Sequence, residues 1–184
     1  MLDMISALIH TYQFENGEHF LNFECFSLKD IVKIAEAKVE NFLKDKNLVL
    51  YSDINSMHFL EADKNLFFNL MINLLTTAIN YSEKNNSIVV TSLLEKECQV
   101  ISIKYSGKPL SEEECKRMFL KDTTFSTVGH GIKMHLCKKI VDFHKGTILV
   151  QNCSNNLNSF IITLPLRQKT VTTKSSLNRQ LQLN

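Results

Sequence analysis

Two long segments place apolar residues at intervals of three and four, the period of an amphipathic helix. The first follows Ser27-Leu28-Lys29-Asp30, in which a serine three positions before an acidic residue is typical of a helix N-terminus, and extends to about Leu43. The second follows Asp63, another good N-cap, and has apolar residues from Phe67 to Ala78 on one face. We therefore expect two long helices, each with one face in a core.

Shorter segments are rich in β-branched and aromatic residues, which is typical of strands. Ser111-x-x-Glu114 predicts a short helix to about Leu120, and a further helix at 131–144 should stop at Gly146. Helices alternate with strands, yet hairpins dominate. The pattern predicts an α/β two-layer sandwich: a mixed, mostly antiparallel sheet with helices packed on one face. The expected strands are 20–26, 48–52, 57–60, 87–94, 98–105, 147–151 and 159–164.

The composition narrows the function only a little. The 184 residues suffice for one compact domain with a short flank, and a net charge of +2 does not indicate a nucleic-acid partner. The five cysteines form no CxxC pair, which favours reduced thiols in the cytoplasm. The longest apolar stretch, Leu66–Leu75, is too short and too polar to span a bilayer. We expect no membrane contact by this chain, which could still be the cytoplasmic part of a membrane receptor.

The second long helix also carries a polar stripe: Asn69, Asn73, Thr77 and Asn80 are three or four residues apart. Alone, such a stripe is the exposed side of an amphipathic helix. Glycine-bearing turns farther along the chain favour a stripe that faces a site. The P-loop pattern is absent, and the histidines lack the helical spacing of zinc ligands.

Three segments, in this order, resemble the ATP-binding domain at the C-terminal end of bacterial sensor histidine kinases, the GHKL or Bergerat fold. DKNLFFNLMINLLTTAINYS at 63–82 resembles the family's N box. ISIKYSGKPLSEEECKRMF at 101–119 resembles the first glycine box and the acidic run before the F box, and GHGIKMHLCKKIVDFHKGTI at 129–148 resembles the second glycine box. The resemblance covers roughly 15–166 and implies a cleft for ATP and Mg²⁺, with phosphoryl transfer to a histidine.

The resemblance also assigns the residues of that cleft. It implies Asn73 as the Mg²⁺ ligand that remains. His144 aligns with a structural histidine of the family, so we expect a capping role for it. The positions implied as cofactor-binding are Asn73, Thr77, Asn80, Tyr81, Tyr105, Gly107, Gly129, Gly131 and Lys133.

Several of these positions depart from the family pattern. Thr77 stands where a second asparagine holds Mg²⁺, and a hydroxyl is a shorter and weaker ligand than an amide carbonyl. Asn80 replaces a phosphate-facing lysine, and Tyr105 replaces the aspartate that accepts the adenine amino group. Pro109 and Lys133 replace glycines. Losing one buried acceptor costs about 1–3 kcal/mol, so these losses together predict a degraded ATP site.

The resemblance divides the chain into three parts. Residues 1–16 would be the end of a dimerising helix, 17–166 the ATP-binding-type domain, and 167–184 a basic flexible tail without acidic residues. His10 is followed by Thr11 rather than an acid and is not expected to accept phosphate. The implied partners are the dimerising, phosphoacceptor helices of the same kinase, forming a homodimer, and the receiver domain of a response regulator.

Three hypotheses remain, in this order. The first is a pseudokinase domain that signals, or acts as a scaffold, without turning over ATP. The second is a working kinase domain in which Lys133 and Lys121 replace the lost cation and Asn73 alone holds the metal. The third is a protein-interaction module that needs no nucleotide and binds a peptide or small effector in its groove.

Overall fold

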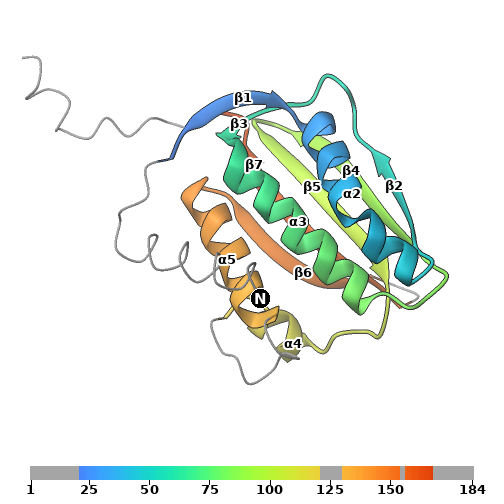
Figure 1. Ribbon diagram of the computed structural model, residues 1–184. Helices are drawn as coiled ribbons and strands as arrows, with labels where there is room; N and C mark the ends of the chain where they lie inside the picture. The colour runs from blue at the N-terminus through green and yellow to red at the C-terminus, as the bar shows by residue number, and fades with distance from the viewer. Residues whose placement is uncertain (1–20, 121–129, 154–155, 168–184) are drawn as a thin grey trace, which may run out of the picture.

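The computed structural model describes residues 21–120, 130–153 and 156–167 (Figure 1). The predicted dimerising helix at 1–16, nearly all of the predicted tail, and Gly129 lie outside these residues. The elements are β1 (Phe23–Ser27), α2 (Leu28–Asp45), β2 (Val49–Asp53), β3 (Phe59–Asp63), α3 (Lys64–Tyr81), β4 (Ser87–Glu95), β5 (Cys98–Ser106), α4 (Glu112–Arg117), α5 (His130–Phe143), β6 (Thr147–Cys153) and β7 (Leu157–Pro165).

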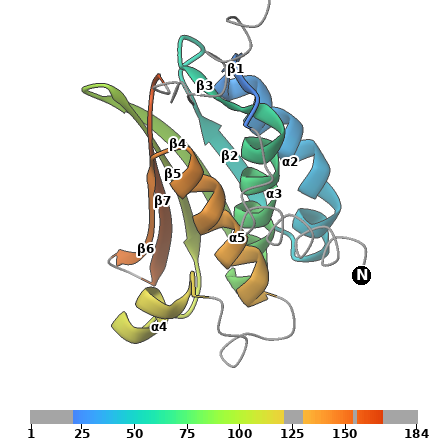
Figure 2. The same ribbon diagram turned by 90° about the vertical axis from the view of Figure 1, so that its left-hand side faces the viewer.

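The predicted sandwich is confirmed. Five strands form a sheet in the order β2-β4-β5-β7-β6, in which only the β2–β4 pair is parallel. Figure 2 shows α2, α3 and α5 together on one side of this sheet, with α4 at its end. β1 and β3 form a separate antiparallel ribbon. β3 extends to Asp63, beyond the predicted strand, because it pairs with β1 from a distant part of the chain.

Buried side chains alternate with more exposed ones along the central strand β5, so the two faces of the sheet differ. On β5, Ile101, Ile103 and Tyr105 are fully buried beneath the helices, whereas Lys104 between them is exposed. On β7, Phe160 is buried on the same side of the sheet, and so is every second residue before and after it. None of the helices in the described ranges is long and apolar enough to cross a membrane.

The N-terminal ends of the helices are capped as the sequence predicts. Ser27 Oγ accepts the Asp30 N–H at 3.3 Å, and Asp63 Oδ1 accepts the Leu66 N–H at 3.0 Å. Ser111 and Glu114 form a complete capping box at α4. These side chains satisfy N–H groups that have no partner inside their own helix.

The C-terminal end of α3 is held by a residue that the local sequence did not indicate. Lys46 Nζ donates to the carbonyl oxygens of Ile79 at 2.9 Å, Asn80 at 2.7 Å and Ser82 at 3.0 Å. Partial burial and the nearby Lys84 lower the pKa of Lys46. A cation at these carbonyls also complements the negative end of the helix dipole.

His144 joins the end of α5 to the start of α3. The Asp63 N–H donates to His144 Nε2 at 2.9 Å, and His144 Nδ1–H donates to the Ile140 carbonyl at 2.7 Å. The side chain is therefore the neutral tautomer protonated on Nδ1. Burial lowers the pKa of His144 below its ordinary 6.5. The predicted capping role of His144 is confirmed.

Stability should depend on pH through His144. Its pKa is lower in the folded chain, so the unfolded chain binds the proton more readily. The stabilisation is therefore complete above pH 6.5 and is lost as the pH falls from 6.5 to the folded-state pKa. Urea unfolding between pH 7.5 and 5.5 measures it. His144→Gln keeps hydrogen-bonding groups but does not titrate, so its stability should fall less; equal falls would contradict the assignment.

Lys145 ends α5 in a conformation that suits glycine. Its φ is 57°, and its N–H and that of Gly146 donate to the Asp142 and Val141 carbonyls at 2.9 Å each. A left-handed backbone costs a residue with a Cβ about 1–2 kcal/mol. Lys145→Gly should therefore raise the free energy of unfolding by about 1 kcal/mol. The control Lys139→Gly, inside α5, should lower the free energy of unfolding by a similar amount. A Lys145→Gly variant that is no more stable than the native chain would refute this explanation.

Candidate nucleotide site

Three parts of the chain converge where the resemblance places the nucleotide: the C-terminal half of α3, the loop after β5 and the start of α5. Thr77 on α3 contacts Met134 on α5, and Gly107 lies under the backbone of Tyr81. Gly131 is buried, whereas Asn80 is exposed. Lys133 is half-buried and Gly129 lies outside the described residues.

Thr77 does not face open space. Its side chain is 1% exposed, and its hydroxyl donates to the Asn73 carbonyl at 2.7 Å. The same oxygen lies 3.5 Å from Met134 Sδ, so α5 covers it. The stripe of α3 is therefore not uniformly exposed: its central hydroxyl is bonded within its own helix and packed against a thioether.

Asn73, the predicted Mg²⁺ ligand, also contacts α5. Its side chain forms a hydrogen bond with the Cys137 thiol, although burial, the larger effect, raises the pKa of that thiol to about 12. Cys137 is fully buried and stays a neutral thiol at physiological pH. The amide of Asn73 is thus partly engaged by the helix interface.

Tyr105 lies on the floor of the candidate site. Its side chain is fully buried and packs on Phe160 with 5.3 Å between the ring centroids. Burial, and more weakly the neighbouring Tyr81 and Cys115, raise the pKa of its phenol. The hydroxyl is buried without a hydrogen-bond partner among the described residues. Tyr105 therefore presents a neutral aromatic ring at this position.

Two asparagines, which sequence reasoning missed, hold the loop after β5. Asn152 on β6 accepts the Leu110 N–H at 3.0 Å and donates back to the Leu110 carbonyl. Asn158 on β7 donates to the Lys108 carbonyl at 3.1 Å. Because Tyr105, Asn158 and Asn152 are register partners across three strands, only the sheet pairing brings them together. The loop is fixed to the sheet by side-chain amides.

Gly107 should not tolerate a larger residue. A Cβ there would lie 2.4 Å from the Tyr81 carbonyl oxygen, which is backbone and cannot turn away. Gly107→Ala should lower the free energy of unfolding by about 1–3 kcal/mol. The matched control is Lys108→Ala, whose side chain is exposed and which should change it by less than about 0.5 kcal/mol. Chemical denaturation measures both, and equal effects would contradict the close approach.

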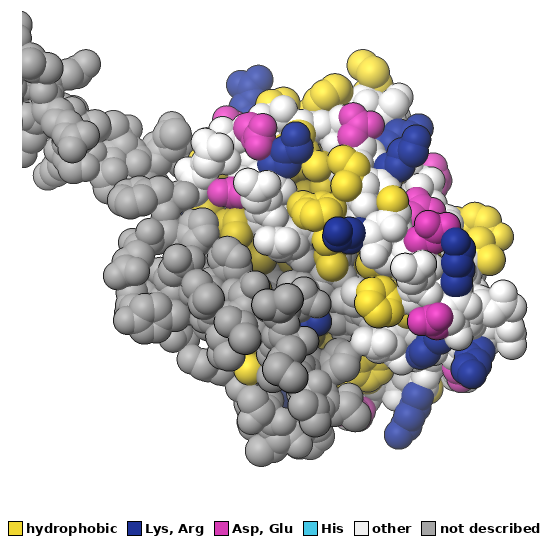
Figure 3. All heavy atoms as spheres, in the orientation of Figure 1, with side chains coloured by type: hydrophobic (Ala, Val, Ile, Leu, Met, Phe, Trp, Pro, Cys, Tyr) yellow, Lys and Arg dark blue, Asp and Glu magenta, His cyan; other side chains and the backbone are white. Residues whose placement is uncertain are grey.

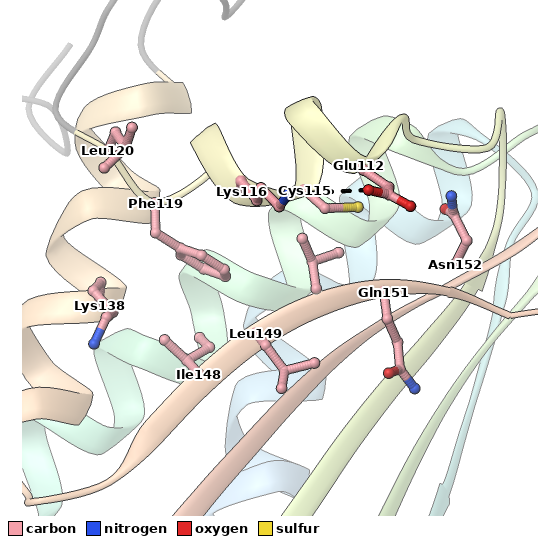
Figure 4. A pocket seen from close by; sticks show the side chains of 11 residues that line it. Glu112, Cys115, Lys116, Phe119, Leu120, Lys138, Ile148, Leu149, Gln151 and Asn152 are labelled. Carbon is pink, nitrogen blue, oxygen red and sulfur yellow. Dashed lines mark ion pairs between the residues drawn. The ribbon is translucent and has the colours of Figure 1, made fainter.

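A groove of about 710 Å³ lies elsewhere, between α4, α5 and β6 (Figure 4). Lys116 and Glu112 form an ion pair of 3.9 Å on its α4 wall. No predicted cofactor-binding residue lines this groove. The groove is therefore distinct from the candidate nucleotide site. Its lining residues are Glu112, Cys115, Lys116, Phe119, Leu120, Lys138, Ile148, Leu149, Val150, Gln151 and Asn152.

The fold and the arrangement around α3 define the class of protein. The sequence profile of the histidine kinase-, DNA gyrase B- and HSP90-like ATPases matches residues 62–168, and the chain belongs to this family. Within it, the chain has the catalytic, ATP-binding type of domain found in sensor histidine kinases. Members of the family normally bind ATP and Mg²⁺.

Curated relatives are sensory proteins. The chain is 31% identical to the adaptive-response sensory kinase SasA of Prochlorococcus marinus strain MIT 9215, over 82% of this chain and 42% of that protein. It is 23% identical to the heme sensor protein HssS of Staphylococcus aureus strain Newman, over 88% of this chain and 36% of that protein. The chain thus spans less than half the length of these relatives.

Solved structures share the fold. The nucleotide-free catalytic domain of histidine kinase ThkA superposes with a TM-score of 0.74 at 28% identity, covering 79% of this chain and 96% of that one. ThkA in complex with the response regulator protein TrrA gives a TM-score of 0.76 at 24% identity, covering 92% of this chain and 49% of that one.

Proposed function

We propose that this chain is a sensor-kinase nucleotide domain whose site no longer supports phosphoryl transfer, and that it acts in signalling as a pseudokinase or scaffold. The observation that carries the proposal is the burial of Thr77 and Tyr105, at the positions implied for the metal and the adenine. Both side chains are packed into the protein where the family pattern has groups that contact the ligand.

The residues present do not fit Mg-ATP. Mg²⁺ requires oxygen ligands in near-octahedral geometry, whereas the Thr77 oxygen is bonded to the Asn73 carbonyl and covered by Met134. The Tyr105 ring fills part of the floor and supplies no carboxylate to accept the adenine amino group. Phosphoryl transfer depends almost entirely on positioning and charge neutralisation, so losing these groups removes the basis of catalysis.

The proposed partners follow from the kinase type. In the whole protein the domain would dock on dimerising helices in the cytoplasm, as part of a homodimer, and engage a receiver domain. The ThkA–TrrA complex supports a receiver as the partner class. The described side chains on the helical face mix both signs of charge with apolar groups (Figure 3). Such a mixed surface suits a protein partner better than the uniform basic surface typical of nucleic-acid binding.

Titration with Mg-ATP tests the proposal directly. A ligand that binds only the folded chain raises its melting temperature in a concentration-dependent way. We expect no saturable rise for the full chain up to millimolar Mg-ATP, because the metal and adenine groups are missing together. Calorimetry gives an independent measurement. A saturable rise at micromolar Mg-ATP would contradict the degraded site and favour the working kinase with atypical ligands.

Restoring the lost groups should restore binding. Thr77→Asn with Tyr105→Asp returns an amide carbonyl for Mg²⁺ and a carboxylate for the adenine amino group. Each restored group should contribute about 1–3 kcal/mol, so that nucleotide affinity rises at least about tenfold. The control Tyr105→Phe keeps the ring without the hydroxyl, and it should show no gain in nucleotide affinity in the same titration. A folded double variant that gains no affinity would show that these two positions are not the main obstacle.

A further inference from the structure

The free edge of β6 lies along the groove between α4 and α5 (Figure 4). Within the described residues β6 pairs only with β7, so the backbone N–H and C=O groups on its other side have no strand beside them. The groove is mostly apolar, with Phe119, Ile148 and Val150 among its lining. A strand edge beside apolar pockets binds extended peptides, because backbone hydrogen bonds supply affinity and alternate side chains fill the pockets.

We propose that residues 168–184 of this same chain occupy the groove as an added strand beside β6, with their apolar side chains between α4 and α5. This proposal is independent of the proposed function, because none of the predicted cofactor-binding residues lines the groove. It explains why an edge strand with an exposed leucine, Leu149 at 44%, can persist in a soluble protein.

The length of the segment and the place where the described chain ends support this occupant. β7 ends at Pro165, two residues after Thr163, which pairs with Thr147, the first residue of β6. Leu166 then forms backbone hydrogen bonds with Glu97 and Glu61, on the β5 side of β7. Strands lie about 4.8 Å apart, so a strand added beside β6 lies three spacings, or about 14 Å, from β5, a distance of about four residues. β6 has 7 residues. Reaching and covering it needs about 11 of the 17 residues from 168 to 184.

The composition of the segment also matches the groove. Thr170-Val171-Thr172-Thr173 is a run of β-branched residues, which favour strands. Three leucines follow, so apolar side chains are available to fill the groove. The segment carries Lys169, Lys174 and Arg179 with no acidic residue. The α4 wall has three glutamates in its first turn, of which Glu112 and Glu113 pair with Lys116 and Arg117 of its last turn. The match between segment and groove therefore lies in the β-branched run and the leucines rather than in charge.

Hydrogen exchange and thiol labelling of the full chain test the proposal. In the test variant the four apolar residues of the segment become serine: Val171→Ser, Leu177→Ser, Leu181→Ser and Leu183→Ser. The matched control leaves them and changes four polar neighbours: Gln168→Ser, Asn178→Ser, Gln180→Ser and Gln182→Ser. The readouts are amide exchange of β6 and the alkylation rate of Cys115, which lines the groove.

The test variant should show β6 amide exchange and Cys115 alkylation about tenfold faster than the native chain. The control should match the native chain, and exchange in the β4–β5 hairpin should be the same in all three. Equal rates in the two variants would overturn the proposal. Protection that grows with protein concentration, together with dimers in sedimentation, would overturn it in favour of a second copy of the chain.

Discussion

The burial of α3 between two helices and the sheet is the constraint on which the rest of the structure depends. α3 contacts α2 on one side, α5 on the other and β5 beneath it (Figure 1). Nearly every turn of the helix is buried, so its position relative to the sheet is set by close packing rather than by any single bond. The buried residues are Leu66, Phe67, Leu70, Met71, Leu74, Leu75, Thr77, Ala78 and Ile79.

This packing of α3 determines the geometry of the candidate nucleotide site. α5 lies against the same stretch of α3 that carries the polar stripe, so Thr77 contacts Met134 and Asn73 contacts Cys137. The polar side chains of the helix are accommodated by bonding within α3 and to α5. A nucleotide bound at these side chains would have to compete with these contacts.

The two ends of α3 are fixed by side chains from distant parts of the chain. The Asp63 side chain caps the start of α3 and also accepts a hydrogen bond from the Asn22 N–H. The backbone N–H of Asp63 donates to His144. At the other end of α3, Lys46 donates hydrogen bonds to the backbone carbonyls. The helix is therefore held along its faces by apolar packing and at its ends by polar contacts. The proposed site and the proposed groove at β6 are separate features attached to this one scaffold.

The sequence by itself determined the sandwich, the N-caps and the family, because these depend on local periodicity, capping residues and motif order. It also led to the prediction that Thr77 and Tyr105 depart from the family pattern, because that prediction needs only residue types. Only the tertiary structure decided that these two side chains are buried, that Asn152 and Asn158 hold the loop after β5, and that Lys46 ends α3. Each of these contacts joins residues more than 30 positions apart or depends on strand register, and no local pattern encodes such pairings.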